Sequence, residues 1–235
     1  MAGTVVIVPA RMASTRLPGK PLADICGRSL ILRVLDGAAE ADPLLVAAAT
    51  DSPEIFGEVR KAGFEAVLTG PAENGTKRVF QAWEILGRPG ERIVNLQGDE
   101  PGAGAGWINA LAGAPVPSMG VSTLVSPMPA DKASDPHTVK AVFDREHRAL
   151  YFSRSPIPWH GSSCHRHIGA YCFTPESLPF CASCTPGPLA SAENLEQLSW
   201  MENGVAITVV PGEWNGMGVD TPEDLEEARR WFSRR

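Results

Sequence analysis

The amino-acid sequence predicts an α/β fold, with a mixed, mostly parallel sheet flanked by helices. The first hundred residues alternate four times between an apolar run, a loop and an amphipathic segment, which is typical of right-handed βαβ units. Residues 5–8 read Val-Val-Ile-Val, a run typical of a strand buried on both faces. The 235 residues, 43% hydrophobic and 20% charged, are enough to build a substantial core.

Each element of the first half follows from a local pattern. Apolar runs predict strands at residues 5–8, 44–49, 64–68 and 92–96. Ser29 is a candidate N-cap for the first helix, and Ser52 with Pro53 begins the second. A third helix is expected over residues 76–86. Ligands of such sheets bind beyond the carboxyl ends of the strands, so the loops at 9–20, 50–51, 69–78 and 97–101 are the candidate binding loops.

The second half has a less regular pattern. Strands are expected at residues 119–125, 139–143, 168–173 and 205–210. One helix is expected over 189–203, ending before Gly204. A last helix is expected from the N-cap Thr221 to Trp231, with Pro222 at its first position. The sequence has no internal repeat and no linker, which favours a single domain.

Charge and composition exclude several classes of protein. The formal net charge of −6 argues against nucleic-acid binding. No apolar stretch approaches 18 residues, so no membrane partner is expected. The N-terminus lacks a basic, signal-like region, which predicts a cytoplasmic protein.

Five cysteines in such a chain do not predict disulfides. Cys181 and Cys184 have a C-x-x-C spacing, and His160, His165 and His167 precede them. A second short-spaced pair of ligands is missing. The pattern favours unrelated thiols and histidines, with structural zinc as the alternative.

The loop after the first strand carries three cations, Arg11, Arg16 and Lys20, together with Ser14. Guanidinium groups pair with phosphate oxygens and lysine adds a point charge, so the loop predicts a triphosphate site. Its alternative interpretation is a solvated basic loop. It is not a P-loop, because Pro21 follows Gly19-Lys20.

Two aspartates form a second candidate site. Asp99 lies in the segment that follows the strand at 92–96, and Asp220 immediately precedes a helix N-terminus. Mg²⁺ bound with a nucleotide typically uses one or two carboxylates plus phosphate oxygens. A turn former or a helix-terminal charge is the alternative for either residue.

Motifs in a fixed order resemble one family, the 3-deoxy-manno-octulosonate (Kdo) cytidylyltransferases that make CMP-Kdo. The basic loop reads Pro-Ala-Arg-x-x-Ser-Thr-Arg-Leu-Pro-Gly-Lys-Pro-Leu. The other motifs are at residues 49–51, 75–76, 95–101, 149–159, 167–171, 195–198 and 218–225. The resemblance implies a nucleotide-diphospho-sugar-transferase-like (Rossmann-like) fold, CTP and an acidic acceptor as substrates, Mg²⁺, and a homodimer. It also implies a nucleotide-binding part at about 1–115 and an acceptor and dimerisation part at about 116–235.

The resemblance assigns residues to each role. Those expected to bind CTP are Pro9, Ala10, Arg11, Ser14, Arg16, Lys20, Gly75, Thr76, Arg78, Gln97 and Asp99. Those expected to bind the acceptor are Gln97, Arg154, His167, Tyr171, Glu196 and Gln197. Lys20, Arg16 and Asp99 are the expected catalytic residues, and Asp99 and Asp220 are the expected metal ligands.

Departures from the family pattern concern the acceptor. Lys77 replaces a usual acid, Ser199 replaces a usual arginine, and the segment 160–166 is shorter than usual. Two acceptors therefore stay open: Kdo, or a small phosphonate or carboxylate such as phosphonoformate. The lost hydroxyl-recognising groups predict slower use of Kdo than of a smaller acid. Retention of both aspartates and all three cations argues against a binding protein that has lost catalysis.

Overall fold

A computed structural model describes residues 3–14, 16–161, 163–214 and 217–234. The chain divides into two compact units, Met1–Asn109 with Asn215–Arg235, and Ala110–Trp214. We refer to them as unit 1 and unit 2. None of the helices in the described residues is long and apolar enough to cross a membrane.

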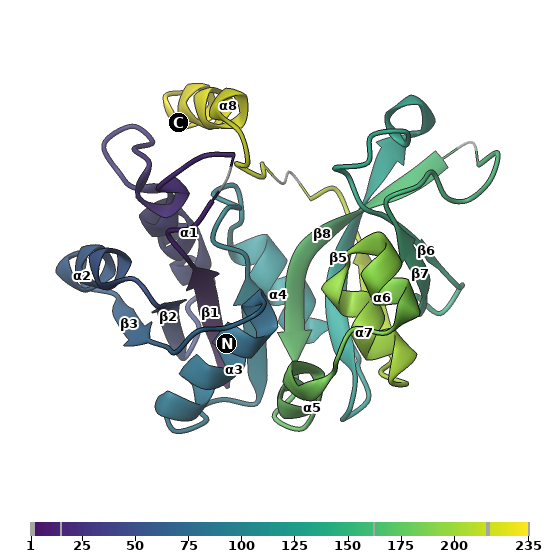
Figure 1. Ribbon diagram of the computed structural model, residues 1–235, viewed down its shortest axis with the longest axis horizontal. Helices are drawn as coiled ribbons and strands as arrows, with labels where there is room; N and C mark the ends of the chain where they lie inside the picture. The colour runs from purple at the N-terminus through teal and green to yellow at the C-terminus, as the bar shows by residue number, and fades with distance from the viewer. Residues whose placement is uncertain (1–2, 15, 162, 215–216, 235) are drawn as a thin grey trace. The chain divides into compact units, whose positions relative to one another are not determined.

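Unit 1 contains a parallel sheet with the strand order β3-β2-β1-β4 (Figure 1). The strands are β1 (Thr4–Ala10), β2 (Leu45–Thr50), β3 (Glu65–Leu68) and β4 (Arg92–Leu96). All seven residues of β1 are buried, as expected of a central strand covered on both faces. The four strands predicted in the first half and their parallel arrangement are confirmed.

Four α-helices of unit 1 begin within one residue of their predicted starts. They are α1 (Leu30–Ala39), α2 (Pro53–Lys61), α3 (Gly75–Ile85) and α8 (Pro222–Phe232), with a short 3₁₀ helix, η1 (Lys20–Leu22). The Ser52 hydroxyl accepts a hydrogen bond from the amide of Ile55, which caps α2. Helix α4 (Ala105–Gly113) was not predicted, and it continues into unit 2.

The C-terminal segment belongs to unit 1, although the sequence interpretation grouped it with the second part. Leu225 and Ala228 of α8 pack with Ile25 and Leu30 around Val219. Apolar burial therefore holds α8 on the N-terminal half of the chain. A capping box at Thr221 begins the helix: its hydroxyl accepts from the amide of Asp224, and the Asp224 carboxylate accepts from the amide of Thr221.

Unit 2 contains a mixed sheet. Its strands are β5 (Val121–Pro129), β6 (Lys140–Phe143), β7 (Ala149–Ser153), β8 (Ser163–Phe173) and β9 (Ile207–Pro211). Strand β5 pairs antiparallel with β8 and parallel with β9, whereas β6 pairs antiparallel with β7 and β8. Its helices are α5 (Ser177–Ser183), α6 (Pro188–Glu193) and α7 (Glu196–Glu202), and η2 (Ala130–Lys132) is a 3₁₀ turn. Strand β7 and helix α5 were not predicted.

The prediction of one helix over 189–203 is wrong. The chain forms α6 and α7 instead, because Asn194 takes a left-handed conformation with φ 51° between them. Asparagine tolerates that conformation better than most residues, so a chain that reads as continuously helical is broken there. The break makes Leu195 the N-cap residue of α7 and sets Glu196 and Gln197 in its first turn.

Candidate functional site

A cavity of about 660 Å³ lies in unit 1 beyond the carboxyl ends of β1 and β4. We call it the basic-loop cavity; it is lined by the loop after β1, the start of α3, the turn after β4, and Asp220. Ten of the eleven residues predicted to bind CTP line it. Its place at the strand ends is where open α/β sheets bind ligands.

The basic loop positions Lys20 by backbone geometry. Gly19 has φ 69°, a left-handed conformation in which glycine has no steric penalty, and the amide of Lys20 donates to the carbonyl of Leu17 at 3.1 Å. The loop thereby turns into η1. The Ser14 hydroxyl accepts from the amide of Leu17, which fixes the earlier bend.

Charged groups meet in this cavity. The Lys20 ammonium lies 2.8 Å from Oδ2 of Asp99 and 3.0 Å from Oδ1 of Asp220. Arg16 pairs with the other oxygen of Asp220 at 3.0 Å. Burial lowers the pKa of Lys20, but the two carboxylates outweigh it and raise that pKa above its ordinary value. Burial likewise opposes ionisation of Asp220, yet Lys20 and Arg16 lower the pKa of this carboxyl.

Asp99 and Asp220 are 121 positions apart in the chain, and the backbone brings them together. The amide of Val219 donates to the carbonyl of Asp99 at 2.9 Å. The amide of Asp220 donates to the Asp224 carboxylate at 2.9 Å, which ties Asp220 to the capping box of α8. The two predicted metal ligands are therefore neighbours, and among the described residues no third His, Cys, Asp or Glu joins them.

Close backbone approach shapes the far wall of the cavity. A Cβ on Gly98 would lie 2.8 Å from the carbonyl oxygen of Pro9, and a Cβ on Gly75 would lie 3.3 Å from Nε2 of Gln97. Glycine at these positions lets the ends of β1 and β4 and the start of α3 come together. The Gln97 amide donates to Oδ1 of fully buried Asn95 at 3.2 Å, a positioning residue that the sequence interpretation did not identify.

Two predicted CTP residues have structural partners. Thr76 is fully buried, does not line the cavity, and accepts a hydrogen bond from the Asn95 amide at 3.3 Å. Arg78 lines the cavity but is only 4% exposed. Its guanidinium donates to Thr69 and to Asp51, each at 2.7 Å. It thus links the ends of β2 and β3 to the first turns of α3.

The predicted acceptor residues other than Gln97 lie in unit 2. The Tyr171 hydroxyl donates to Oε1 of Gln197 at 3.2 Å. The rings of His167 and Tyr171 are 5.5 Å apart. Burial raises the pKa of Tyr171 well above its ordinary value, with the Glu196 carboxylate adding to the effect. Together these side chains make a packed, largely neutral group.

A bulge in β8 sets this geometry. The β5–β8 register passes from Thr123–Tyr171 directly to Leu124–Ile168, so Gly169 and Ala170 have no partner of their own. A bulge redirects the side chains that flank it. The Thr123 hydroxyl thereby lies within hydrogen-bond distance of three groups: the carbonyls of Ile168 and Ala170, which accept, and the ring of His167.

His167 is neutral in this arrangement. The Thr123 hydroxyl has one proton, and the Ala170 carbonyl accepts it at 2.8 Å. Nε2 of His167 lies 2.8 Å from the same hydroxyl oxygen, and donation from Nε2 to that oxygen would leave the Thr123 proton for the Ala170 carbonyl. Burial lowers the pKa of His167 to about 3, so the ring is uncharged near neutral pH.

Arg154 is held by the backbone. Its guanidinium donates to the carbonyls of Glu193 at 2.9 Å, Pro136 at 3.0 Å and Asn194 at 3.5 Å. These contacts tie the end of β7 to the break between α6 and α7. Arg154 is thus placed to order the segment that leads into α7.

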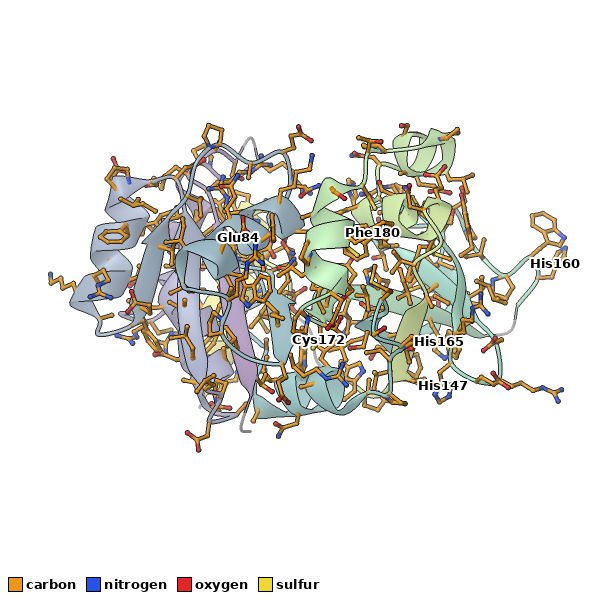
Figure 2. All side chains as sticks on the ribbon, turned by 90° about the horizontal axis from the view of Figure 1, so that it is seen from below. Glu84, His147, His160, His165, Cys172 and Phe180 are labelled. Carbon is orange, nitrogen blue, oxygen red and sulfur yellow. The ribbon has the colours of Figure 1, made fainter. Side chains whose placement is uncertain are left out.

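The cysteines and histidines of unit 2 are dispersed. Figure 2 shows His160 at the end of a loop, away from His165 and Cys172. His165 packs against Phe143, with ring centroids 4.9 Å apart, and His147 contacts the same ring at 6.0 Å. Among the described residues none of these groups forms a three-ligand metal cluster.

Comparisons with known proteins place this geometry in a family. Residues 5–207 match the family model described as "Cytidylyltransferase". A 3-deoxy-manno-octulosonate cytidylyltransferase of Anaeromyxobacter dehalogenans is 44% identical, over 97% of each chain. The corresponding protein of Chlorobaculum tepidum is 42% identical over 98% of each chain.

A solved structure agrees with the sequence relatives. It is described as CMP:2-keto-3-deoxy-manno-octonic acid synthetase complexed with CTP, and it is 33% identical to this chain. The similarity covers 99% of both chains with a TM-score of 0.91, and the expected nucleotidyltransferase-type α/β fold is confirmed. The chain belongs to the cytidylyltransferase family, and within it to the 3-deoxy-manno-octulosonate cytidylyltransferases.

Proposed function

We propose that this chain is a CTP-dependent cytidylyltransferase that transfers CMP to Kdo and releases pyrophosphate. The observation that carries the proposal is the basic-loop cavity, where three cationic side chains and two carboxylates meet at the ends of β1 and β4. The relatives named above act on the same pair of substrates by their names. Family membership and cavity chemistry therefore agree.

The reaction is attack of an acceptor oxygen on the α-phosphorus of CTP, with pyrophosphate as the leaving group. The protein's part is positioning and stabilisation of charge. Arg11, Arg16 and Lys20 line the cavity and would pair with the phosphate oxygens, the two arginines through their planar forks. As negative charge moves to the departing pyrophosphate, these fixed cations stabilise it.

We propose Mg²⁺ as the cofactor, held by Asp99 and Asp220. The donor set fits, because two neighbouring carboxylates already hold a cation between them, the Lys20 ammonium. Two carboxylates leave positions for phosphate oxygens and water, as Mg²⁺ sites with nucleotides do. When bound, the ion would polarise the α-phosphate. Asp99 and Asp220 would orient it against the basic loop.

The acceptor residues proposed in unit 2 have a chemistry that suits a hydroxylated acid. Nε2 of Gln197 is buried and has no hydrogen-bond partner within the described part of the chain. A buried donor without a partner is costly, so a ligand oxygen would stabilise it. Tyr171 holds the other end of this amide. Nothing in the comparisons favours the phosphonate alternative, whereas the relatives' names point to Kdo.

A homodimer remains part of the proposal. Five large apolar side chains of unit 2 are exposed among the described residues, and the most exposed are Leu150 at 57% and Trp159 at 85%. Burial of such side chains between copies would stabilise association. Sedimentation equilibrium at micromolar concentration would measure the mass, and a monomer at all concentrations would contradict this part.

Pyrophosphate release from CTP, ATP, GTP and UTP, with Kdo and with small phosphonates and carboxylates, tests the proposed function. We expect release with CTP and Kdo in Mg²⁺. Equal release from ATP or GTP would refute the assignment of the base. Faster release with phosphonoformate than with Kdo would restore the alternative acceptor.

A further inference from the structure

The Lys20 ammonium lies between the two carboxylates that are the proposed metal ligands. It contacts Oδ2 of Asp99 at 2.8 Å and Oδ1 of Asp220 at 3.0 Å. Its side chain is 15% exposed, whereas those of Asp99 and Asp220 are 34% and 46% exposed. A cation placed in this way competes with any other cation for the same oxygens.

Backbone contacts make the arrangement a property of the fold. Gly19 and η1 aim Lys20 into the cavity, and the carbonyl of Asp99 accepts from the amide of Val219, one residue before Asp220. The backbone around Lys20, Asp99 and Asp220 therefore holds the three charged groups close together. Their carboxylates are presented side by side, which is also what a divalent ion requires.

Lys20 and Arg16 hold the pair differently. Arg16 contacts Asp220 alone, and its side chain is 51% exposed. Lys20 bridges both carboxylates and is the more buried of the two cations. Since like charges repel strongly at contact distance, a divalent ion can bind both carboxylates only when the ammonium moves away.

We propose that Lys20 controls the order of binding: its ammonium competes with the divalent metal for Asp99 and Asp220, and it releases them when the phosphates of CTP offer it other oxygens. The inference rests on the proposed function, because it takes CTP and Mg²⁺ as the ligands. Free metal then binds weakly, and metal enters with the nucleotide. Lys20 is a point charge on a flexible stem, so it can pass from a carboxylate to a phosphate without movement of the backbone.

The exchange couples the two ligands. Nucleotide draws Lys20 off the carboxylates and so tightens metal binding, and linkage requires that metal tighten nucleotide binding by the same factor. Loss of the lysine charge should have opposite effects on the two ligands. It should weaken CTP binding and strengthen the binding of metal alone, which a merely structural role would not produce.

The test measures Mn²⁺ binding to the full chain without nucleotide, from the electron paramagnetic resonance signal of free Mn²⁺. We expect Lys20→Met to bind Mn²⁺ about tenfold more tightly than the parent, within the usual range of coupling between sites. Lys20→Arg keeps the cation and should bind as weakly as the parent. Lys61→Met, which removes an exposed lysine at the end of α2, is the matched control and should not differ from the parent.

Two further measurements locate the effect. Asp99→Asn added to Lys20→Met should abolish the gained Mn²⁺ affinity. Saturating CTP should tighten Mn²⁺ binding to the parent more than to Lys20→Met. If Lys20→Met does not fold, as judged by circular dichroism, Lys20→Gln takes its place with the same expectations.

The outcomes separate this inference from the proposed function. Unchanged or weaker Mn²⁺ binding by Lys20→Met, in a protein whose parent releases pyrophosphate from CTP with Kdo, would overturn the inference alone. A parent that releases no pyrophosphate, and whose Mn²⁺ affinity responds neither to CTP nor to Asp99→Asn, would overturn the proposed function and this inference with it.

Discussion

The two groups of predicted site residues are held together by different forces. In unit 1, Lys20 forms ion pairs with Asp99 and Asp220, and all three side chains are partly exposed. In unit 2, His167 and Tyr171 are neutral and packed among aromatic rings. The first group suits phosphates and a metal, whose charge it can match. The second suits hydroxyl groups, which are uncharged and can both donate and accept hydrogen bonds.

The two groups should respond differently to a change of charge. Removal of a charge in unit 1 leaves partners that are partly exposed to solvent, so the fold should tolerate the change while the reaction slows. A charge forced onto the buried ring of His167 loses its hydration and should destabilise the fold itself.

The largest effect is expected from Asp99→Asn and Asp220→Asn. Each should lower kcat for pyrophosphate release by at least about a hundredfold, or about 2.7 kcal/mol of barrier, because a neutral amide is a poor ligand for a divalent ion. Circular dichroism and thermal unfolding should match the parent. Asp36→Asn, which removes only the partner of Arg28 on α1, is the control. Turnover within about tenfold of the parent would remove either aspartate from the metal site.

His167 should make the protein sensitive to acid. Its folded pKa of about 3 lies below the unfolded value of 6.5, so the unfolded state binds the extra proton as the pH falls below 6.5. The contribution of the neutral ring to the free energy of unfolding is fully present above pH 6.5 and is lost progressively toward pH 3. At pH 5 the loss should be about 2 kcal/mol.

Urea unfolding at pH 7 and pH 5 measures this loss. His167→Gln should reduce the difference between the two pH values, whereas His137→Gln, at an exposed position, should not. An equal pH dependence in the parent and His167→Gln would show that the ring accepts a proton without cost.

Tyr171→Phe should act on the acceptor and spare the nucleotide. The change removes the hydroxyl that donates to Gln197 and leaves that amide free to turn. We expect KM for Kdo to rise by about tenfold, the value of one hydrogen bond of about 1.4 kcal/mol, with KM for CTP unchanged. The second tyrosine of the chain provides the matched control, Tyr151→Phe. An equal rise in both KM values would contradict the proposal that unit 2 binds the acceptor and unit 1 binds CTP.

Lys77→Glu, which restores the usual acid, should have the smallest effect. The Lys77 ammonium lies 2.6 Å from Glu73, one helical turn earlier in the chain, and Lys77 does not line the cavity. In the variant, two acids at i and i+4 repel each other, whereas a negative charge near a helix N-terminus is favourable. The free energy of unfolding should therefore change by no more than about 0.5 kcal/mol.

Turnover with Kdo should change by less than about twofold, a difference of about 0.4 kcal/mol. A rise of tenfold or more would show that this departure from the family pattern does shape acceptor use.

Local sequence signals were sufficient to predict the strands and helices that have clear patterns, and also the cationic residues of the basic loop. The apolar run at residues 5–8 predicts a buried strand, which the structure extends to Thr4–Ala10, and a loop with Arg11, Arg16 and Lys20 follows it directly. Caps at Ser52 and Thr221 placed two helix starts, because a cap acts within three residues. Local chemistry was sufficient wherever the partners are close in the chain.

Contacts between residues far apart in the chain, and features without a local sequence signal, became visible in the tertiary structure alone. It placed Lys20 between Asp99 and Asp220, 79 and 200 positions away, and it made Thr76 and Arg78 supports of the cavity wall. The break at Asn194 and the bulge at residues 169–170 escaped prediction. Both are departures of one or two residues from a regular pattern, and the second lies beside Tyr171 and Phe173, whose rings contact Trp200 of α7. Propensity is a sum over neighbours in the chain, whereas these features depend on contacts between residues that the chain alone does not bring together.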